Sequence, residues 1–131
     1  MLERLSTVSE RLADGLVVPL RDRLHRAVAD GAGTNAEISR TVRGVYREWK
    51  LNQIDAQVAD ALRLAHGIGL LAAAAPGRPM CWTIDPAGPS CPDAEDNTLA
   101  GVVPAGEAYP TGHRTAPAHP GCRCLISPTG N

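Results

Sequence analysis

Aromatic side chains are almost absent from this 131-residue sequence. It has no phenylalanine, and two tryptophans and two tyrosines bring the aromatic fraction to only 3%, although hydrophobic residues make up 44%. A packed core is therefore possible, but leucine, valine, isoleucine and alanine have to build most of it. The length suffices for one domain, or for one domain with an extended tail, and is too short for two independent cores.

The sequence also lacks the features that would place it on a membrane or along a polyanion. Its formal net charge is −1, which excludes a strongly basic nucleic-acid coat and a polybasic membrane anchor. The longest apolar run, residues 68–75, is far shorter than the roughly 20 residues that cross a bilayer. No secretory signal opens the sequence, so we expect a soluble protein that works inside a cell or a particle.

Composition changes near Pro76 and divides the chain into two segments. Residues 1–75 hold ten of the thirteen basic residues and a single proline, whereas residues 76–131 hold the other ten prolines and all four cysteines. Turn-forming residues at this density are typical of irregular backbone and short strands. We therefore predict an α+β protein, mainly α, with a helical segment over residues 1–75 and a small irregular tail with short strands over residues 76–131.

Apolar residues of the first segment recur every three or four positions, which is the period of an α-helix. A first helix is expected to end at Asp14 and Gly15. Pro19 fits the first turn of a second helix, because its missing N–H needs no partner there. Gly31 is expected to end that helix.

A capping box formed by Thr34 and Glu37 starts a third and much longer helical pattern. Its apolar stripe runs over Ile38, Val42, Val45, Trp49, Ile54, Val58, Ala61, Ala65 and Ile68. The stripe slips by one position after Trp49, which predicts a bend, or a turn of the buried face toward a different neighbour. A helix over residues 34–73 would be on the order of 60 Å long, so it either projects, packs along a partner or breaks near Asn52 into an antiparallel pair. The alternative is an ordinary helical bundle.

Charges on the predicted helices alternate in sign, which is typical of a solvated surface. Only the stretch from Arg40 to Lys50 approaches the clustered positive charge that binding to nucleic acid requires.

The tail contains the residues best suited to bind a metal ion. Its cysteines and histidines are Cys81, Cys91, His113, His119, Cys122 and Cys124. Zinc is held by four thiolate or imidazole ligands in a tetrahedron, and short spacings let one turn supply two or three of them. Pro120 and Gly121 allow the reversal that would aim Cys122 at the same point as His119. The sequence therefore predicts a structural zinc site whose ligands are Cys91, His119, Cys122 and Cys124, with Cys81 or His113 as substitutes.

Two other readings of the cysteines stay open at this point. They could be free thiols, two of them packed in the core, or they could form disulfides, for which four cysteines allow three pairings. A segment rich in proline and glycine and poor in large apolar residues folds with difficulty unless something cross-links it, which favours the metal.

Three stretches of the tail follow one another in a recognisable order. They are CPDAEDNTLAG at 91–101, YPTGH at 109–113 and PAHPGCRC at 117–124, preceded by VYREWK at 45–50 and QID at 53–55. This order resembles the C-terminal pattern of the MuF-like phage head morphogenesis family, CxxC … LxG … P … PPxHPxCRC. The resemblance covers roughly residues 42–127, and HPGCRC is its most specific part. Ala94 stands in place of the second cysteine of the family pair, and 115–117 reads Thr-Ala-Pro in place of a double proline.

The resemblance implies a structural role. Members of that family sit inside the procapsid of tailed phages and prophages, associate with the portal or the capsid shell, and assist head assembly or DNA delivery. The implied partners are phage portal or capsid proteins, with packaged DNA as a further partner and with no membrane and no small-molecule substrate. The implied location is the capsid interior of the virion or the host bacterial cytoplasm.

Two alternatives come from other classes of protein. A zinc-dependent hydrolase would need three protein ligands, an open fourth position and a nearby general base. Glu95, Asp96 and Glu107 are the acids available, but acids beside turns are usually solvated or capping. A small zinc-stapled nucleic-acid-binding module is disfavoured because residues 76–131 carry three basic and five acidic side chains. We therefore expect a protein that binds and does not catalyse.

Smaller expectations concern turns and an arginine of the tail. Asp93 and the pair Asp96-Asn97 predict turns, with Asn97 in the left-handed conformation. Arg123, which lies between two predicted ligands, is expected to donate hydrogen bonds to a thiolate or to carbonyl groups of the tail.

Overall fold

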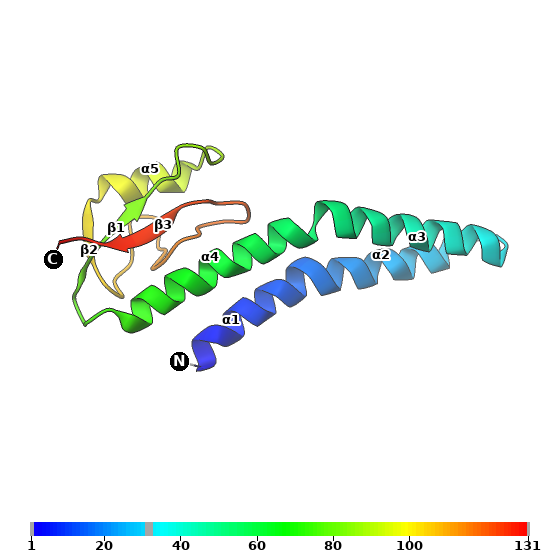
Figure 1. Cartoon of the computed structure of the whole chain (residues 1–131), viewed down its shortest axis with the longest axis horizontal. Coiled ribbons are helices and arrows are strands. Elements are labelled where there is room, and N and C mark those ends of the chain that lie inside the picture. The colour runs from blue at the N-terminus through cyan, green and yellow to red at the C-terminus, as the bar shows by residue number, and fades with distance from the viewer. Residues whose placement is uncertain (1, 31–32, 131) are drawn as a thin grey trace.

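A computed structural model describes residues 2–30 and 33–130 of the chain, with side chains from residue 6 onward. Figure 1 shows a long helical hairpin with a small domain, the tail, at one end. In chain order the elements are α1 (Leu2–Leu12), the π-helical stretch η1 (Ala13–Val17), α2 (Val18–Ala29), α3 (Asn35–Asn52), α4 (Ile54–Ala73), β1 (Pro79–Thr83), α5 (Pro92–Leu99), β2 (Val102–Pro104) and β3 (Leu125–Pro128). The predicted fold class, mainly helical with a small sheet and a cysteine cluster in the tail, is confirmed.

The hairpin has two arms that run antiparallel to one another. The first arm is α1, η1 and α2, and the second is α3 and α4; α2 packs against α3, and α1 packs against α4 (Figure 1). The predicted bend falls at Gln53, whose backbone φ of −119° departs from helical geometry. The helix nevertheless continues in one direction, because Gln53 N–H still donates to the carbonyl of Trp49 at 3.1 Å. The prediction of an antiparallel pair folded at Asn52 is therefore wrong: the long helix pairs with the first arm instead.

The predicted end of the first helix at Asp14 and Gly15 is also wrong. The chain passes through both residues as a π-helix and enters α2, where Pro19 takes its expected place in the first turn. The two arms approach closely at Gly15: a Cβ atom there would lie 2.1 Å from the side-chain oxygen of Gln57 on α4, and that flexible side chain would have to move aside. Glycine in a helical pattern usually marks a helix end, but here the helical backbone continues through Gly15 and the opposite arm packs close to it.

The turn between the arms ends in the predicted capping box, which is confirmed. The Glu37 carboxylate accepts a hydrogen bond from Thr34 N–H at 2.8 Å, and Thr34 pairs in return with the backbone of the first turn of α3. Gly31 itself lies outside the described residues, and α2 ends just before it at Ala29. None of the helices in the described part of the chain combines the length and the hydropathy needed to cross a membrane.

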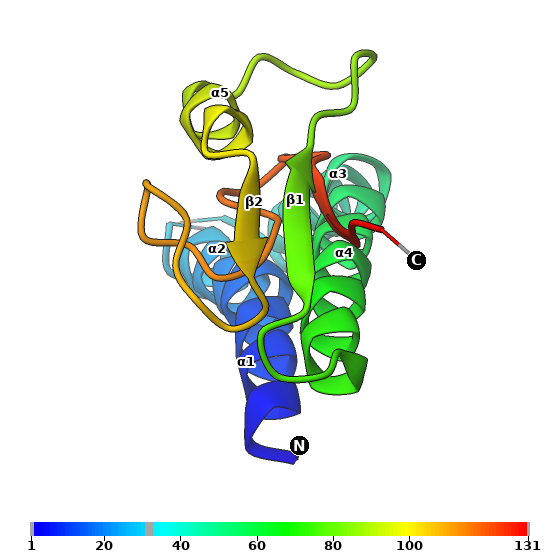
Figure 2. The same ribbon diagram turned by 90° about the vertical axis from the view of Figure 1, so that its left-hand side faces the viewer.

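The tail is built on a three-stranded antiparallel sheet with the order β2-β1-β3. Met80 and Trp82 of the central strand alternate into a core that also contains Tyr109, Ile126 and Val103. Trp82 and Tyr109 meet edge to face with ring centroids 5.1 Å apart. Leu70 and Leu71 near the end of α4 pack against this core, so the sheet is attached to the second arm. Figure 2, seen from the tail end, shows the tail lying in front of both arms.

Residues 92–99 form helix α5 and not the predicted turns. Pro92 occupies the first turn, where it needs no N–H partner, and Asp93 and Glu95 lie near the positive end of the helix dipole. Asn97 is fully buried and has no left-handed backbone, because every positive φ in the described residues belongs to a glycine. The side-chain oxygen of Asn97 instead accepts hydrogen bonds from the backbone N–H and the hydroxyl of Thr111.

Replacing Trp49 with phenylalanine tests what holds the arms together at the π-helical stretch. The Trp49 indole N–H donates to the Leu16 carbonyl at 3.1 Å. Trp49→Phe keeps most of the ring but loses that bond, so we expect the free energy of unfolding in urea to fall by about 1 kcal/mol. Tyr46→Phe, on the neighbouring and exposed ring, is the matched control and should change it little. Equal losses in the two variants would contradict this account.

Candidate metal centre

Cys91 is positioned by the start of α5. It is the N-cap residue, with extended backbone (φ −135°, ψ 102°), and Pro92 follows it directly. The carbonyl of Cys91 accepts a hydrogen bond from Ala94 N–H at 3.0 Å, which closes the first turn of the helix. This geometry holds the Cys91 side chain at a fixed point beside the sheet, where it is buried.

Cys122 and Cys124 are positioned by a tight turn that precedes β3. The turn is closed by a 3.1 Å hydrogen bond from Cys122 N–H to the His119 carbonyl. Gly121 within it has φ +78°, a left-handed conformation that costs a residue with a side chain about 1–2 kcal/mol. The predicted reversal at Pro120 and Gly121 is therefore present, and the strand begins only at Leu125.

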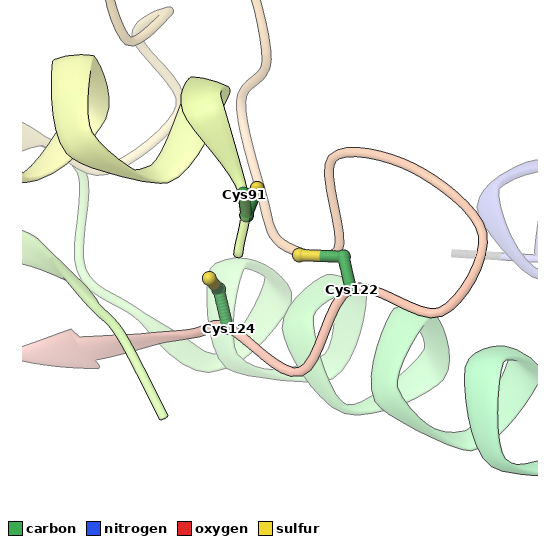
Figure 3. A group of neighbouring side chains, drawn as sticks. All are labelled: Cys91, Cys122 and Cys124. Carbon is green, nitrogen blue, oxygen red and sulfur yellow. The ribbon is translucent and has the colours of Figure 1, made fainter. Parts of the chain in front are cut away.

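The three cysteines converge on one point. Their sulfur atoms all lie within 4.8 Å of one another, and Figure 3 shows the three side chains directed toward a common centre from two separate segments. Cys91, Cys122 and Cys124 expose 7%, 0% and 3% of their surface, so water has little access to the sulfur atoms. Two thiolates on a tetrahedral zinc ion lie about 3.8 Å apart, which follows from a Zn–S distance of about 2.3 Å. This group could hold a metal ion.

His119 lies at the edge of the three-sulfur group and joins it through Cys91. Its Nε2 atom is 3.0 Å from Cys91 Sγ, and its Nδ1 atom is 2.9 Å from the Pro120 carbonyl. A carbonyl can only accept, so the proton of that bond belongs to Nδ1. In the neutral imidazole this leaves the Nε2 lone pair directed at the cysteines. Metal-bound histidines are oriented in the same way, by a bond from the other ring nitrogen to a carbonyl or carboxylate.

The thiols of the cluster differ in acidity. Burial by itself raises the pKa of Cys122, but hydrogen bonds from the backbone N–H groups of Ala118 and Cys124 oppose it. Contacts with the thiols of Cys124 and Cys91 act in the same direction, and together these bonds lower the pKa of Cys122 below its ordinary value. Cys122 is therefore the cysteine best prepared to carry negative charge.

The other two thiols are held in the protonated form. The pKa of Cys124 is raised to about 11, mostly by burial and further by the charge of Cys122, with the indole N–H of Trp82 opposing the shift. Burial also raises the pKa of Cys91, against a backbone N–H bond from Ala94 and with the charge of Cys122 adding to the rise. A bound cation removes this mutual repulsion, because it favours the deprotonated form of every ligand.

Neither substitute ligand belongs to the cluster. Cys81 lies on β1, is only partly buried, and has Thr83 Oγ1 as its hydrogen-bonding neighbour at 4.0 Å. His113 bonds through Nδ1 to the Thr111 hydroxyl at 2.8 Å. Among the described residues, the donor atoms that gather within 4.8 Å of one another are the three sulfurs of Cys91, Cys122 and Cys124.

Arg123 and the candidate acids stand apart from the cluster. Arg123 donates to the carbonyl of Ala87 at 3.2 Å and forms an ion pair with Asp85 at 2.6 Å. Of the predicted acceptors, a thiolate or a carbonyl group of the tail, the structure therefore has the carbonyl. The acids considered as general bases for a hydrolase, Glu95, Asp96 and Glu107, are exposed and lie outside the group of converging donors.

Asp60 is the functional residue that sequence reasoning missed. It lies on α4, exposes only 6% of its surface, and its Oδ2 accepts a hydrogen bond from Gly121 N–H at 2.8 Å. Its other oxygen is 3.5 Å from Arg63. The bond joins the second arm of the hairpin to the turn that carries His119 and Cys122. The sequence does contain one indication that Asp60 is buried: it is an acid among alanine and leucine residues on the apolar side of the predicted helix.

The donor set fits a structural metal site better than a catalytic one. Three thiols and one imidazole are the soft ligands of closed tetrahedral zinc sites. They join the start of α5 to the turn before β3, two segments about thirty residues apart. A metal held there would cross-link the two segments and would supply no open position beside a base. In a comparison with known proteins, no family model, no curated protein and no solved structure matches this chain.

Elemental analysis of the purified protein tests the centre. We expect about one equivalent of zinc per chain, and a melting temperature that falls when a chelator removes it. Cys122→Ser should lose both the zinc and the chelator response while keeping most of its helical circular dichroism, because the hairpin has its own contacts. Cys81→Ser, outside the cluster, is the matched control. Less than about a tenth of an equivalent, with no chelator effect, would rule the centre out.

A second experiment concerns Asp60. Asp60→Ala removes the acceptor of Gly121 N–H and so loosens the turn that carries His119 and Cys122. Partners that orient metal ligands typically change metal affinity by about 10- to 100-fold. We expect a loss in that range, measured by competition with a chromophoric chelator. Asp55→Ala, which removes an exposed acid from the same helix, should leave the affinity unchanged. The role assigned to Asp60 is wrong if the two variants release metal alike.

Proposed function

We propose that this protein is a structural component of a phage or prophage head, which binds portal or capsid protein during head assembly and uses zinc as an internal clamp. The observation that carries the proposal is the His119–Cys124 turn. It brings Cys122 and Cys124 against Cys91 in a buried cluster with His119 beside it. These are the residues on which the resemblance to the MuF-like family rests. A buried, closed donor set supports binding and not turnover.

The shape of the molecule supports a role in assembly. The hairpin extends well away from the tail (Figure 1), so most of each arm has only the other arm to pack against. Leu51 and Leu62 expose 70% and 65% of their surface, and Val58 between them is also exposed. Val58 and Leu62 lie one turn apart on α4, and Leu51 lies near the end of α3, just before the bend at Gln53. Exposed apolar side chains gathered at this bend, beside the exposed Asp55, support a contact with another protein here.

The two alternative functions have less support. A hydrolase needs a base near its metal, and the nearest candidates are exposed acids outside the cluster. A nucleic-acid-binding tail would need positive charge around the metal, but the tail has more acids than bases, and Arg123 is neutralised by Asp85.

Co-expression with the portal protein and the major capsid protein from the same phage or prophage genome tests the proposal. We expect one of the two to co-purify through affinity capture and size-exclusion chromatography. Leu51→Glu with Leu62→Glu should weaken that complex by about tenfold or more, since it places charge in an apolar contact. Leu99→Glu, on the 84% exposed residue of α5, is the control. Absence of both proteins from the purified sample would contradict the proposal.

A further inference from the structure

One face of α3 carries four basic side chains and no acid. Arg40, Arg43, Arg47 and Lys50 follow one another at spacings of three, four and three residues. At 3.6 residues per turn they fall within an arc of about 80°, on the side opposite the buried Val45. All four are exposed. They form a row about 15 Å long that points away from α2.

No acidic side chain of the described residues forms an ion pair with this basic face. The ion pairs of the described residues are Arg21–Asp22, Arg23–Glu48, Arg63–Asp60 and Arg123–Asp85. The two acids of α3 are engaged elsewhere, because Glu48 pairs with Arg23 across the hairpin and Glu37 caps the helix. Unpaired cations that lie in a row repel one another, and binding an anion relieves that repulsion.

The basic face is also hollowed. A shallow depression on it is lined by Ala36, Ser39, Arg40, Arg43, Gly44 and Arg47. The small residues between the arginines let an extended ligand approach the helix closely while guanidinium groups flank it. The depression contains no aromatic or large aliphatic residue that would anchor a protein partner.

Charge is distributed unevenly along the molecule. Residues 18–52, which include α2 and α3, carry seven basic and four acidic side chains, a net charge of +3. Because the whole chain has −1, the remainder carries −4. The positive part is the end of the hairpin farthest from the tail (Figure 1). The net charge that excludes a basic coat therefore conceals a local excess of positive charge.

We propose that the basic face of α3 binds the phosphate backbone of duplex nucleic acid without reading its sequence. Planar guanidinium groups suit phosphate oxygens, and evenly spaced cations without an apolar anchor suit a polyanion better than a folded protein surface. Binding needs neither the metal nor a capsid partner, so it stands apart from the role proposed above.

Fluorescence anisotropy with two labelled 25-base-pair DNA duplexes of unrelated sequence tests this proposal on the full chain. We expect both duplexes to bind with similar affinity. The logarithm of the binding constant should fall against the logarithm of the salt concentration with a slope of about −3, since three or four phosphate contacts each contribute about −0.9. Arg43→Gln with Arg47→Gln should make the slope shallower by about 2 and weaken binding about tenfold at low salt.

The controls separate local contacts from overall charge. Arg21→Gln with Arg114→Gln also removes two positive charges, but from exposed positions outside the basic face. This control pair should leave the salt dependence of binding unchanged. Arg43→Lys with Arg47→Lys should retain most of the binding. The proposal is overturned if the unmodified protein does not bind at 50 mM salt, or if the control pair loses as much as the test pair. It is also overturned if polyglutamate competes more strongly than unlabelled duplex, which would assign the face to an acidic protein.

Discussion

The convergence of three sulfur atoms is the constraint on which the tail depends. The core of the tail is small, and its ten prolines and seven glycines leave few residues for regular hydrogen-bonded structure. Cys91 fixes where α5 begins, and Cys122 and Cys124 fix how the chain enters β3. The central strand β1 lies between the two edge strands that these segments lead into. A metal bridge at the cluster would therefore set the positions of both edge strands.

The same cluster is joined to the hairpin by one buried carboxylate. Asp60 accepts the N–H of Gly121, so the order of the turn that carries His119 and Cys122 and the orientation of the second arm depend on one another. Leu70 and Leu71 add an apolar contact near the end of the same helix. The arm that exposes Leu51, Val58 and Leu62 is thus held by the part of the molecule that contains the cysteine cluster. This is how a small chain can present a long surface at a fixed angle.

Local signals in the sequence predicted local features, and tertiary contacts account for the errors. The capping box at Thr34, the bend after Trp49 and the reversal at Gly121 each follow from residues a few positions apart, and each is present. The predicted helix end at Gly15 is wrong because the chain continues there as a π-helix that packs against α4, a contact that no local pattern shows. Val58 belongs to the apolar period but is exposed, since neither the first arm nor the tail covers its side of α4.

The candidate site divides in the same way. The grouping of Cys122 with Cys124 follows from their short spacing in the sequence. The prediction that Cys91 joins them is based on the stretch CPDA at 91–94, where Ala94 stands in place of a second cysteine. Asp60 lies about sixty residues from its partner, and no local pattern connects the two. Asn97 is similar, because only the fold shows that Thr111 reaches it.

The uneven distribution of charge has a consequence for how the molecule would meet a large anionic body. A rod that is positive at one extremity and negative at the other experiences a torque in such a field before any contact is made. It would turn the end of the hairpin that contains α2 and α3 toward the anionic body and the tail with its cysteine cluster away from it. Any protein that recognises the tail would then find it facing away from the anion and free to be engaged.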